Sequence, residues 1–140
     1  MYIDSNLVVS GTRSTTGTWT GQTVESTELS TYSIDLAATK DLSKGKQLYF
    51  VVMITTAFST CDTVNFQVVT ADNAALTSNL VVQMETGALA RTSLTINRAP
   101  IVIPIGSALG TEDQYLGLRY TVAGSADTGV VIAFVAFDTP

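Results

Sequence analysis

The sequence predicts an all-β protein, a jelly-roll antiparallel β-sandwich of about eight strands. Thr and Val are conspicuous throughout the chain, and β-branched side chains favour pleated, half-buried backbone over helix. Short apolar or alternating runs recur at the spacing of sandwich strands, with Gly, Asp and Ser turns between them. No sustained helical period interrupts them.

The chain opens with a short expected strand at 3–9, followed by a polar tract at 10–30 that contains three glycines. We interpret this tract as a polar arm or long loop of a single domain that spans residues 1–140. Trp19 is its largest apolar residue, so we expect the indole to order the tract. A brief strand is expected next, at 33–36.

The clearest strands lie near the middle of the chain. Residues 48–54 form an unbroken apolar run, which is typical of a strand covered on both faces and predicts a place inside a sheet. Residues 64–68 alternate apolar and polar side chains, which predicts one dry and one wet face. We expect these two strands to pair antiparallel, with a turn at Asp41, Ser43 and Gly45 leading into the first.

The second half of the chain contains further strands. Pro100 and Pro104 bracket an apolar segment and confine it to a sheet edge or a bulge, because Pro donates no backbone hydrogen bond. Residues 115–122 and 130–137 are expected to form a terminal hairpin. An immunoglobulin-like sandwich fits the same number of strands, but its Cys…Trp…Cys arrangement is absent, so it stays the alternative.

Charge and hydropathy exclude several partner classes. The net charge of −5 and the absence of clustered Lys and Arg argue against nucleic acid and against an anionic membrane surface. No apolar stretch approaches the roughly 20 residues of a membrane-spanning helix. The N-terminus lacks the basic start of a signal peptide, and Cys61 is the single cysteine, so we expect synthesis in the cytoplasm and no internal disulfide.

The sequence also disfavours catalysis. It contains no His, which removes the commonest general base, the commonest metal ligand and the Ser-His and Cys-His nucleophile schemes. Its Asp and Glu residues lie mainly in expected turns, where such residues usually bind nearby backbone amides or water. We therefore expect no enzymatic activity, no cofactor and no metal site.

The surface composition instead indicates a binding role. Only 14% of residues are charged, fewer than a free monomer usually exposes, so part of the surface is expected to be covered by a partner. A homo-oligomer is expected, a dimer before a trimer. The candidate partner-binding residues are Trp19, Arg13 and Arg119. Trp19 fits either an interface anchor or a plug at one end of the sandwich, and Arg119 either pairs across strands or reaches a partner's carboxylate.

The chain also resembles the capsid cement, or decoration, proteins of short-tailed phages typified by the Bordetella phage. The resemblance spans nearly the whole chain and rests on four motifs in order: Met1-Tyr2-Ile3-Asp4; Lys40-Asp41-Leu42-Ser43-Lys44-Gly45 leading to Leu48-Tyr49; Thr55-Thr56-Ala57-Phe58; and Tyr115-Leu116-Gly117-Leu118-Arg119-Tyr120-Thr121-Val122 before the final strand to Asp138.

The resemblance implies a jelly roll and a non-enzymatic role. Oligomers would bind the major capsid protein on the outside of the icosahedral shell, across capsomer boundaries, and reinforce it. The protein would then be made in the host cytoplasm and located on the exterior of the virion. The alternative is a carbohydrate- or receptor-binding jelly-roll module of a phage virion, which needs solvent-facing aromatic residues around a groove.

Overall fold

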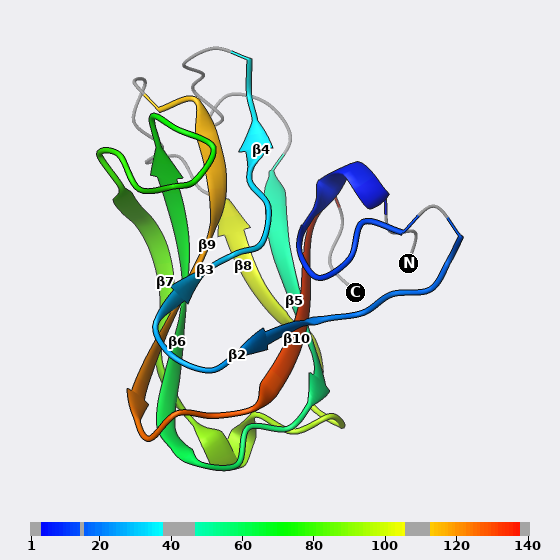
Figure 1. Ribbon diagram of the computed structural model, residues 1–140, viewed down its shortest axis with the longest axis vertical. Helices are drawn as coiled ribbons and strands as arrows, with labels where there is room; N and C mark the ends of the chain where they lie inside the picture. The colour runs from blue at the N-terminus through cyan, green and yellow to red at the C-terminus, as the bar shows by residue number, and fades with distance from the viewer. Residues whose placement is uncertain (1–3, 15, 38–46, 106–112, 138–140) are drawn as a thin grey trace.

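Two antiparallel sheets pack face to face in the computed structural model, which describes residues 4–14, 16–37, 47–105 and 113–137 (Figure 1). Sheet A has the strand order β1-β10-β5-β8, with β2 also beside β10; its strands are β1 (Val8–Ser10), β2 (Gln22–Val24), β5 (Leu48–Thr56), β8 (Ile101–Ile105) and β10 (Gly129–Ala136). Sheet B has the order β3-β9-β6-β7, with β4 also beside β9; its strands are β3 (Glu28–Leu29), β4 (Ile34–Asp35), β6 (Cys61–Ala71), β7 (Val81–Ala90) and β9 (Tyr115–Gly124). Two 3-10 turns complete the described elements, η1 (Ser5–Leu7) and η2 (Arg91–Ser93).

This strand order is that of a jelly roll. The short strands β1 and β2 pair with different stretches of β10, and β3 and β4 divide β9 in the same way. Each short pair therefore fills one strand position, which gives eight positions arranged as two sheets of four. The predicted all-β jelly-roll sandwich is confirmed, and the two split strands account for the difference between about eight expected strands and ten observed ones.

Two predicted pairings are wrong. Strand β5 pairs with β10 and β8 in sheet A, whereas β6 pairs with β7 and β9 in sheet B, so the two central strands face each other across the core. Strands β9 and β10 likewise lie in opposite sheets and form no hairpin. The alternation of side chains along a strand specifies which faces are dry, but it does not specify the neighbouring strand. In a jelly roll most connections cross from one sheet to the other.

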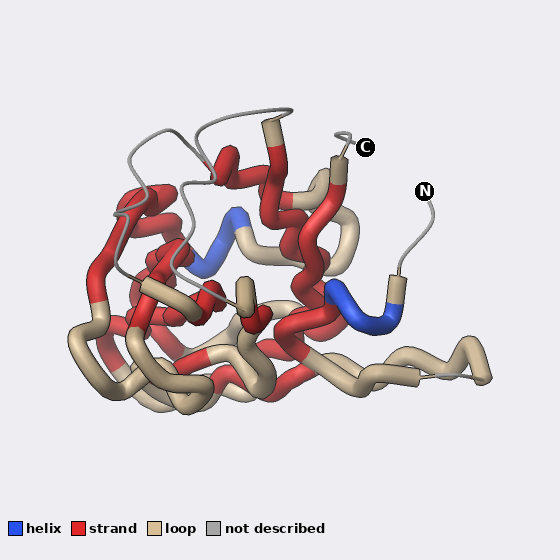
Figure 2. Tube along the Cα trace, turned by 90° about the horizontal axis from the view of Figure 1, so that it is seen from above, coloured by secondary structure: helices blue, strands red, loops and turns tan. Residues whose placement is uncertain are grey.

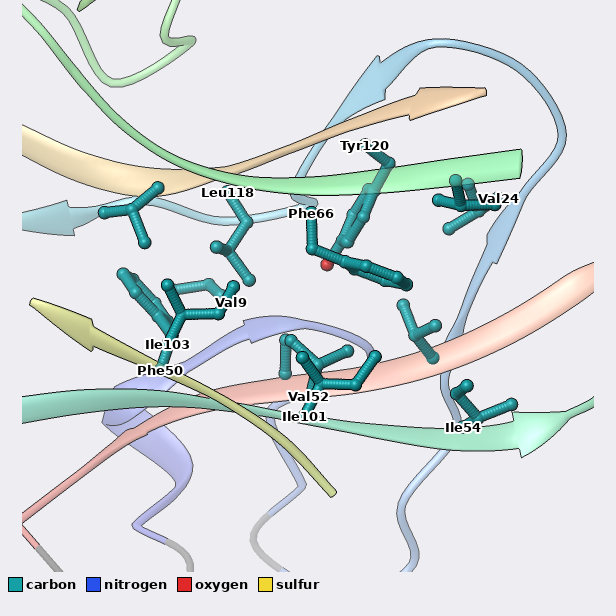
Figure 3. Close-up of a cluster of buried hydrophobic side chains, with 14 of the residues drawn as sticks. Val9, Val24, Phe50, Val52, Ile54, Phe66, Ile101, Ile103, Leu118 and Tyr120 are labelled. Atoms are coloured by element: carbon teal, nitrogen blue, oxygen red, sulfur yellow. The ribbon is translucent and has the colours of Figure 1, made fainter. Parts of the chain in front are cut away.

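The main core lies between the sheets and is built from the inward-facing side of each strand (Figure 3). Phe50, Val52 and Ile54 of β5 face Phe66 of β6, which makes an edge-on contact with the Tyr120 ring at a centroid distance of 5.7 Å. Burying a side chain of this size stabilises the fold by about 1.5–3 kcal/mol. The packed aromatic pair contributes about 0.5–1.5 kcal/mol more.

One polar contact crosses this dry core. The Tyr120 hydroxyl is hydrogen bonded to the Ser10 hydroxyl, which joins β9 of sheet B to β1 of sheet A, and both residues are fully buried. Burial raises the pKa of Tyr120 well above its ordinary value, so the phenol stays neutral. In the described part of the chain, every buried side-chain nitrogen or oxygen has a hydrogen-bond partner.

Other predicted elements have mixed outcomes. Strand β8, which contains Pro104, lies at the edge of sheet A as predicted. The first predicted strand is shorter than expected and begins only at Val8, because the Asp4 carboxylate accepts the Asn6 backbone N–H at 2.9 Å and caps a 3-10 turn before it. The turn predicted at 41–45 lies outside the described residues.

Candidate binding surface

The polar tract predicted as an arm belongs to a segment that closes the sandwich. We call residues 8–35, which contain β1 to β4, the N-terminal strap. The strap runs from blue to cyan in Figure 1 and covers the free edge of β10 in sheet A and the free edge of β9 in sheet B. The tract at 10–30, which the sequence predicts as a polar arm or long loop, contains the two short strands β2 and β3.

The part of the strap that does project is a loop described at residues 11–14 and 16–21, which we call the finger. In Figure 2 it extends from the body as the tan loop at the lower right. The Thr12 N–H donates to the Thr20 carbonyl oxygen at 2.7 Å and closes the base of the finger. Gly11 is required there, because it has a φ of 107° and a Cβ would lie 2.6 Å from the same carbonyl oxygen. The finger is therefore held at a defined base.

Trp19, the first candidate partner-binding residue, lies on the finger and is partly buried. It packs against an apolar cluster on the outer face of sheet A, the side turned away from the main core; the cluster contains Val8, Val51, Ile132, Phe134 and Ala136. Neither sequence interpretation anticipates this position. Trp19 does not fill the space between the sheets, and its indole already has a packing partner within the chain.

Arg13, the second candidate, serves the strap itself. Its Nε donates to the Val8 carbonyl oxygen at 3.0 Å, and one terminal nitrogen donates to the Ser33 carbonyl oxygen at 3.3 Å. The guanidinium also lies 4.5 Å from the centre of the Tyr32 ring, a cation–π contact. These contacts join the beginning and the end of the strap, so Arg13 positions the segment that carries the finger.

Arg119, the third candidate, lies on the opposite side of the molecule, on the outer face of sheet B. Its Nε donates to the Gln67 side-chain oxygen at 2.7 Å, and the Gln67 amide nitrogen donates to a Glu85 carboxylate oxygen at 2.6 Å. Hydrogen bonds from Gln67 and Asn65 lower the pKa of Glu85. The predicted cross-strand pairing of Arg119 is observed, and the three candidates do not form a single site.

Sequence reasoning missed Asp127, the most heavily hydrogen-bonded side chain described. Its carboxylate is 2% exposed and accepts backbone N–H groups at 2.7–3.1 Å from the following residues: Ser59, Thr60, Cys61, Thr128 and Gly129. Burial alone would raise the pKa of Asp127, but these amides hold it well below its ordinary value. Each donor lies in the β5–β6 connection, in the β9–β10 connection, or at the first residue of the strand that follows. The carboxylate is therefore suited to holding these two connections together.

The described residues offer little for other chemistry. Among them, no group of three or more His, Cys, Asp or Glu side chains is placed to hold a metal ion. No helix in the same part of the chain has the length and hydropathy needed to cross a membrane.

Comparison with known families assigns the chain. Residues 19–135 match the family described as Bbp16, which covers the sandwich from Trp19 almost to the end of β10. The chain belongs to the Bbp16 family. The name Bbp16 suggests a Bordetella phage protein, and the all-β sandwich is compatible with a structural protein of a phage. A comparison of the chain with curated proteins finds no match.

Proposed function

We propose that the protein is a non-enzymatic cement protein that binds the outer surface of an icosahedral phage capsid and stabilises the shell. The observation that carries this proposal is the match to the Bbp16 family over residues 19–135. The resemblance to capsid cement proteins seen in the sequence points to the same role. The partners would be the major capsid protein and further copies of the chain, a dimer before a trimer.

The physical properties of the sandwich suit this role. A jelly roll whose strap is already paired with β10 and β9 orders few residues on docking, so little binding free energy is lost to ordering. Many identical copies bind one shell, so the total stabilisation of the shell is large even when each copy binds with modest affinity. Because a ligand that binds only the assembled lattice stabilises that lattice by mass action, no catalytic step is needed.

The structure gives less support to the alternative of a carbohydrate-binding module. Such a module stacks sugars on aromatic rings with a free face. Trp19 packs on the outer face of sheet A, and Tyr32 lies under the Arg13 guanidinium. Both rings of the strap are therefore engaged with the protein's own groups.

Heating capsids with and without the protein tests the proposal. Complete capsids should release their DNA at a higher temperature than capsids assembled in its absence, while the major capsid protein forms the same shell in both. Equal release temperatures would reject the cement role. Sedimentation of the purified protein at tens of micromolar tests the dimer separately, and a monomer would leave assembly dependent on the capsid alone.

A further inference from the structure

The two sheets differ in how their outermost strands are protected. Among the longer described strands, only β7 and β8 lie at the end of a sheet, since β5, β6, β9 and β10 have neighbours on both sides. Strand β8 is short and contains Pro104, which donates no backbone hydrogen bond and so blunts that edge. Strand β7 has ten residues, VVQMETGALA, without Pro or Lys. It therefore carries none of the residues that usually block an open edge.

The composition of β7 favours pairing with another strand. Its single charged residue is Glu85, whose carboxylate accepts hydrogen bonds from the Asn65 and Gln67 side chains of β6. Val81 and Val82 at its beginning are 46% and 36% exposed. A long, weakly charged edge with exposed apolar residues is a template for a further strand, and the same strand of a second copy can pair with it across a two-fold axis.

Two bulges interrupt this edge. Thr86 and Gly87 lie opposite the single residue Phe66, because the flanking pairs are Asn65 with Ala88 and Gln67 with Glu85. A second extra residue, Gln83, lies between the pairs that Met84 and Val82 form with β6. A bulge bends its strand and increases the local twist, so the backbone groups of the edge no longer line up with a regular partner.

Side chains hold both bulges in place. The Gln83 amide nitrogen donates to the Thr70 hydroxyl of β6 at 2.8 Å. The Thr86 hydroxyl accepts the Phe66 backbone N–H at 3.2 Å and donates to the Gly87 carbonyl oxygen at 2.9 Å. Gly87 has a φ of 73°, a conformation that glycine adopts without strain. Each extra residue thus has its own hydrogen bond to β6, which stabilises the bulged shape.

We propose that the two bulges of β7 keep the open edge of sheet B from pairing with a second copy of the chain, so that copies associate through another surface. The bulges take the place of the Lys or Pro that other edge strands use. The inference concerns the free protein and does not depend on the proposed cement function.

Deleting Gln83 and Gly87 together tests the proposal. The deletion restores one-to-one pairing with β6 without changing the register on either side, because Met84 then follows Val82 and Ala88 follows Thr86. In sedimentation at tens of micromolar, the deletion variant should form species of at least about twice the mass of the unmodified protein. Ala88→Lys, at an exposed position of β7, should reverse this association in the deletion variant and leave the unmodified protein unchanged.

A pair of single substitutions covers a deletion variant that fails to fold, as judged by circular dichroism. Gly87→Val disfavours the φ of 73°, whereas Gly87→Asn tolerates it, because Asn adopts left-handed backbone far more readily than a β-branched residue. No atom lies within 4 Å of a Cβ at this position, so neither side chain clashes. The associated fraction should be at least about threefold greater for Gly87→Val than for Gly87→Asn.

The results that would overturn the proposal are specific. A folded deletion variant that sediments like the unmodified protein would show that the bulges do not protect the edge. Association that Ala88→Lys does not reverse would show that the deletion exposes some other surface. If the deletion variant does not fold, equal association of Gly87→Val and Gly87→Asn would reject the protective role.

Discussion

The Asp127 carboxylate accepts the Cys61 backbone N–H at 2.7 Å, which ties the connection after β9 to the first residue of β6. The same carboxylate accepts the N–H groups of Ser59 and Thr60, in the connection between β5 and β6. It also accepts those of Thr128 and Gly129 just before and at the start of β10. One side chain thereby joins two of the chain crossings at this end of the sandwich, β5 to β6 and β9 to β10, which helps to hold sheet A and sheet B in register.

Replacing Asp127 with Asn should destabilise the protein by about 3 kcal/mol, because Asn offers one acceptor oxygen and turns an NH2 group toward backbone donors that are then left unsatisfied. Urea unfolding followed by circular dichroism measures the loss. Asp62→Asn is the control, since Asp62 is exposed on the same strand β6, and it should change the free energy of unfolding by less than about 0.5 kcal/mol. Equal midpoints for the two variants would contradict the structural role of Asp127.

Asp127 also predicts a pH dependence. Its folded pKa is depressed below the unfolded value of about 3.9. The stabilisation is therefore fully present above that value and is lost as the pH falls toward the folded pKa. The difference in unfolding free energy between the unmodified protein and Asp127→Asn should shrink by about 1.4 kcal/mol for each pH unit below 3.9. Urea titrations at pH 7 and pH 3 check this, and a difference that does not change with pH would count against it.

Cys61 should be unreactive in the folded protein. Burial and then the neighbouring Asp127 carboxylate raise the pKa of its thiol to about 11, and the residue is fully buried. At pH 8 the thiolate is about a thousandth of the population, so reaction with a thiol reagent should be at least 100-fold slower than in urea. Because the folded pKa is raised above about 8.5, this group stabilises the fold below that pH and the stabilisation is lost between pH 8.5 and 11. Cys61→Ala should lack that slope.

The sequence predicts the fold better than the arrangement of its strands. The apolar run in β5 and the alternation in β6 reflect local burial, and both strands form where expected. The strands with which they pair depend on which connections cross from one sheet to the other. That depends on segments far away in the sequence, which the local pattern does not report. The sequence does not predict strand β2, which lies in the polar tract. This strand has only three residues, Gln22–Val24, and fully buries only one apolar side chain, so it shows almost no periodic pattern.

The candidate site was less predictable for the same reason. Asp127 lies in a stretch that is typical of a turn, and no local pattern distinguishes a solvated turn carboxylate from one that receives five backbone amides. Gln67 was expected on a wet face, yet it is 7% exposed because Arg119 and Glu85 enclose it. Arg13 carried no signal beyond its position in the polar tract. Strands β5 and β10 are apolar at successive positions rather than at alternate ones. This pattern in the sequence indicates that the outer face of sheet A is apolar.

Leu76 and Gly117 should show a strong energetic coupling. Leu76 is 1% exposed with a φ of 56°, and a Cβ at Gly117 would overlap its Cδ1 atom and crowd the Ser30 hydroxyl. Leu76→Ala should cost about 2–3 kcal/mol and Gly117→Ala about 1–3 kcal/mol. The double variant should cost at least about 1 kcal/mol less than the sum, since the shortened side chain leaves room for the new methyl group. Ala75→Ser, exposed in the same connection, is the neutral control; additive losses would show that Leu76 does not pack on Gly117.

Trp19→Ala should lower the stability of the free protein, because the indole covers part of the apolar cluster on the outer face of sheet A. Exposing about half of such a side chain costs about 2 kcal/mol, which lowers the melting temperature by about 5 °C in a domain of this size. Thr18→Ala, at an exposed neighbouring position of the finger, should leave the melting temperature unchanged.

Trp19 is the only tryptophan of the chain, so its fluorescence reports on this face alone. If Trp19 is an interface anchor, binding to capsids should shift its emission to shorter wavelength and reduce its quenching by acrylamide, because the remaining exposed part of the ring loses water. The capsid protein also contributes tryptophan fluorescence. A second measurement avoids this background: only this chain is labelled with 5-fluorotryptophan, and the fluorine NMR resonance of Trp19 is followed. A Trp19→Ala variant that melts normally and binds capsids about thirtyfold more weakly would show that the indole is held for the partner rather than for the cluster beneath it. A variant that melts lower and still occupies capsids fully would show that Trp19 serves the stability of the fold and is not the capsid contact.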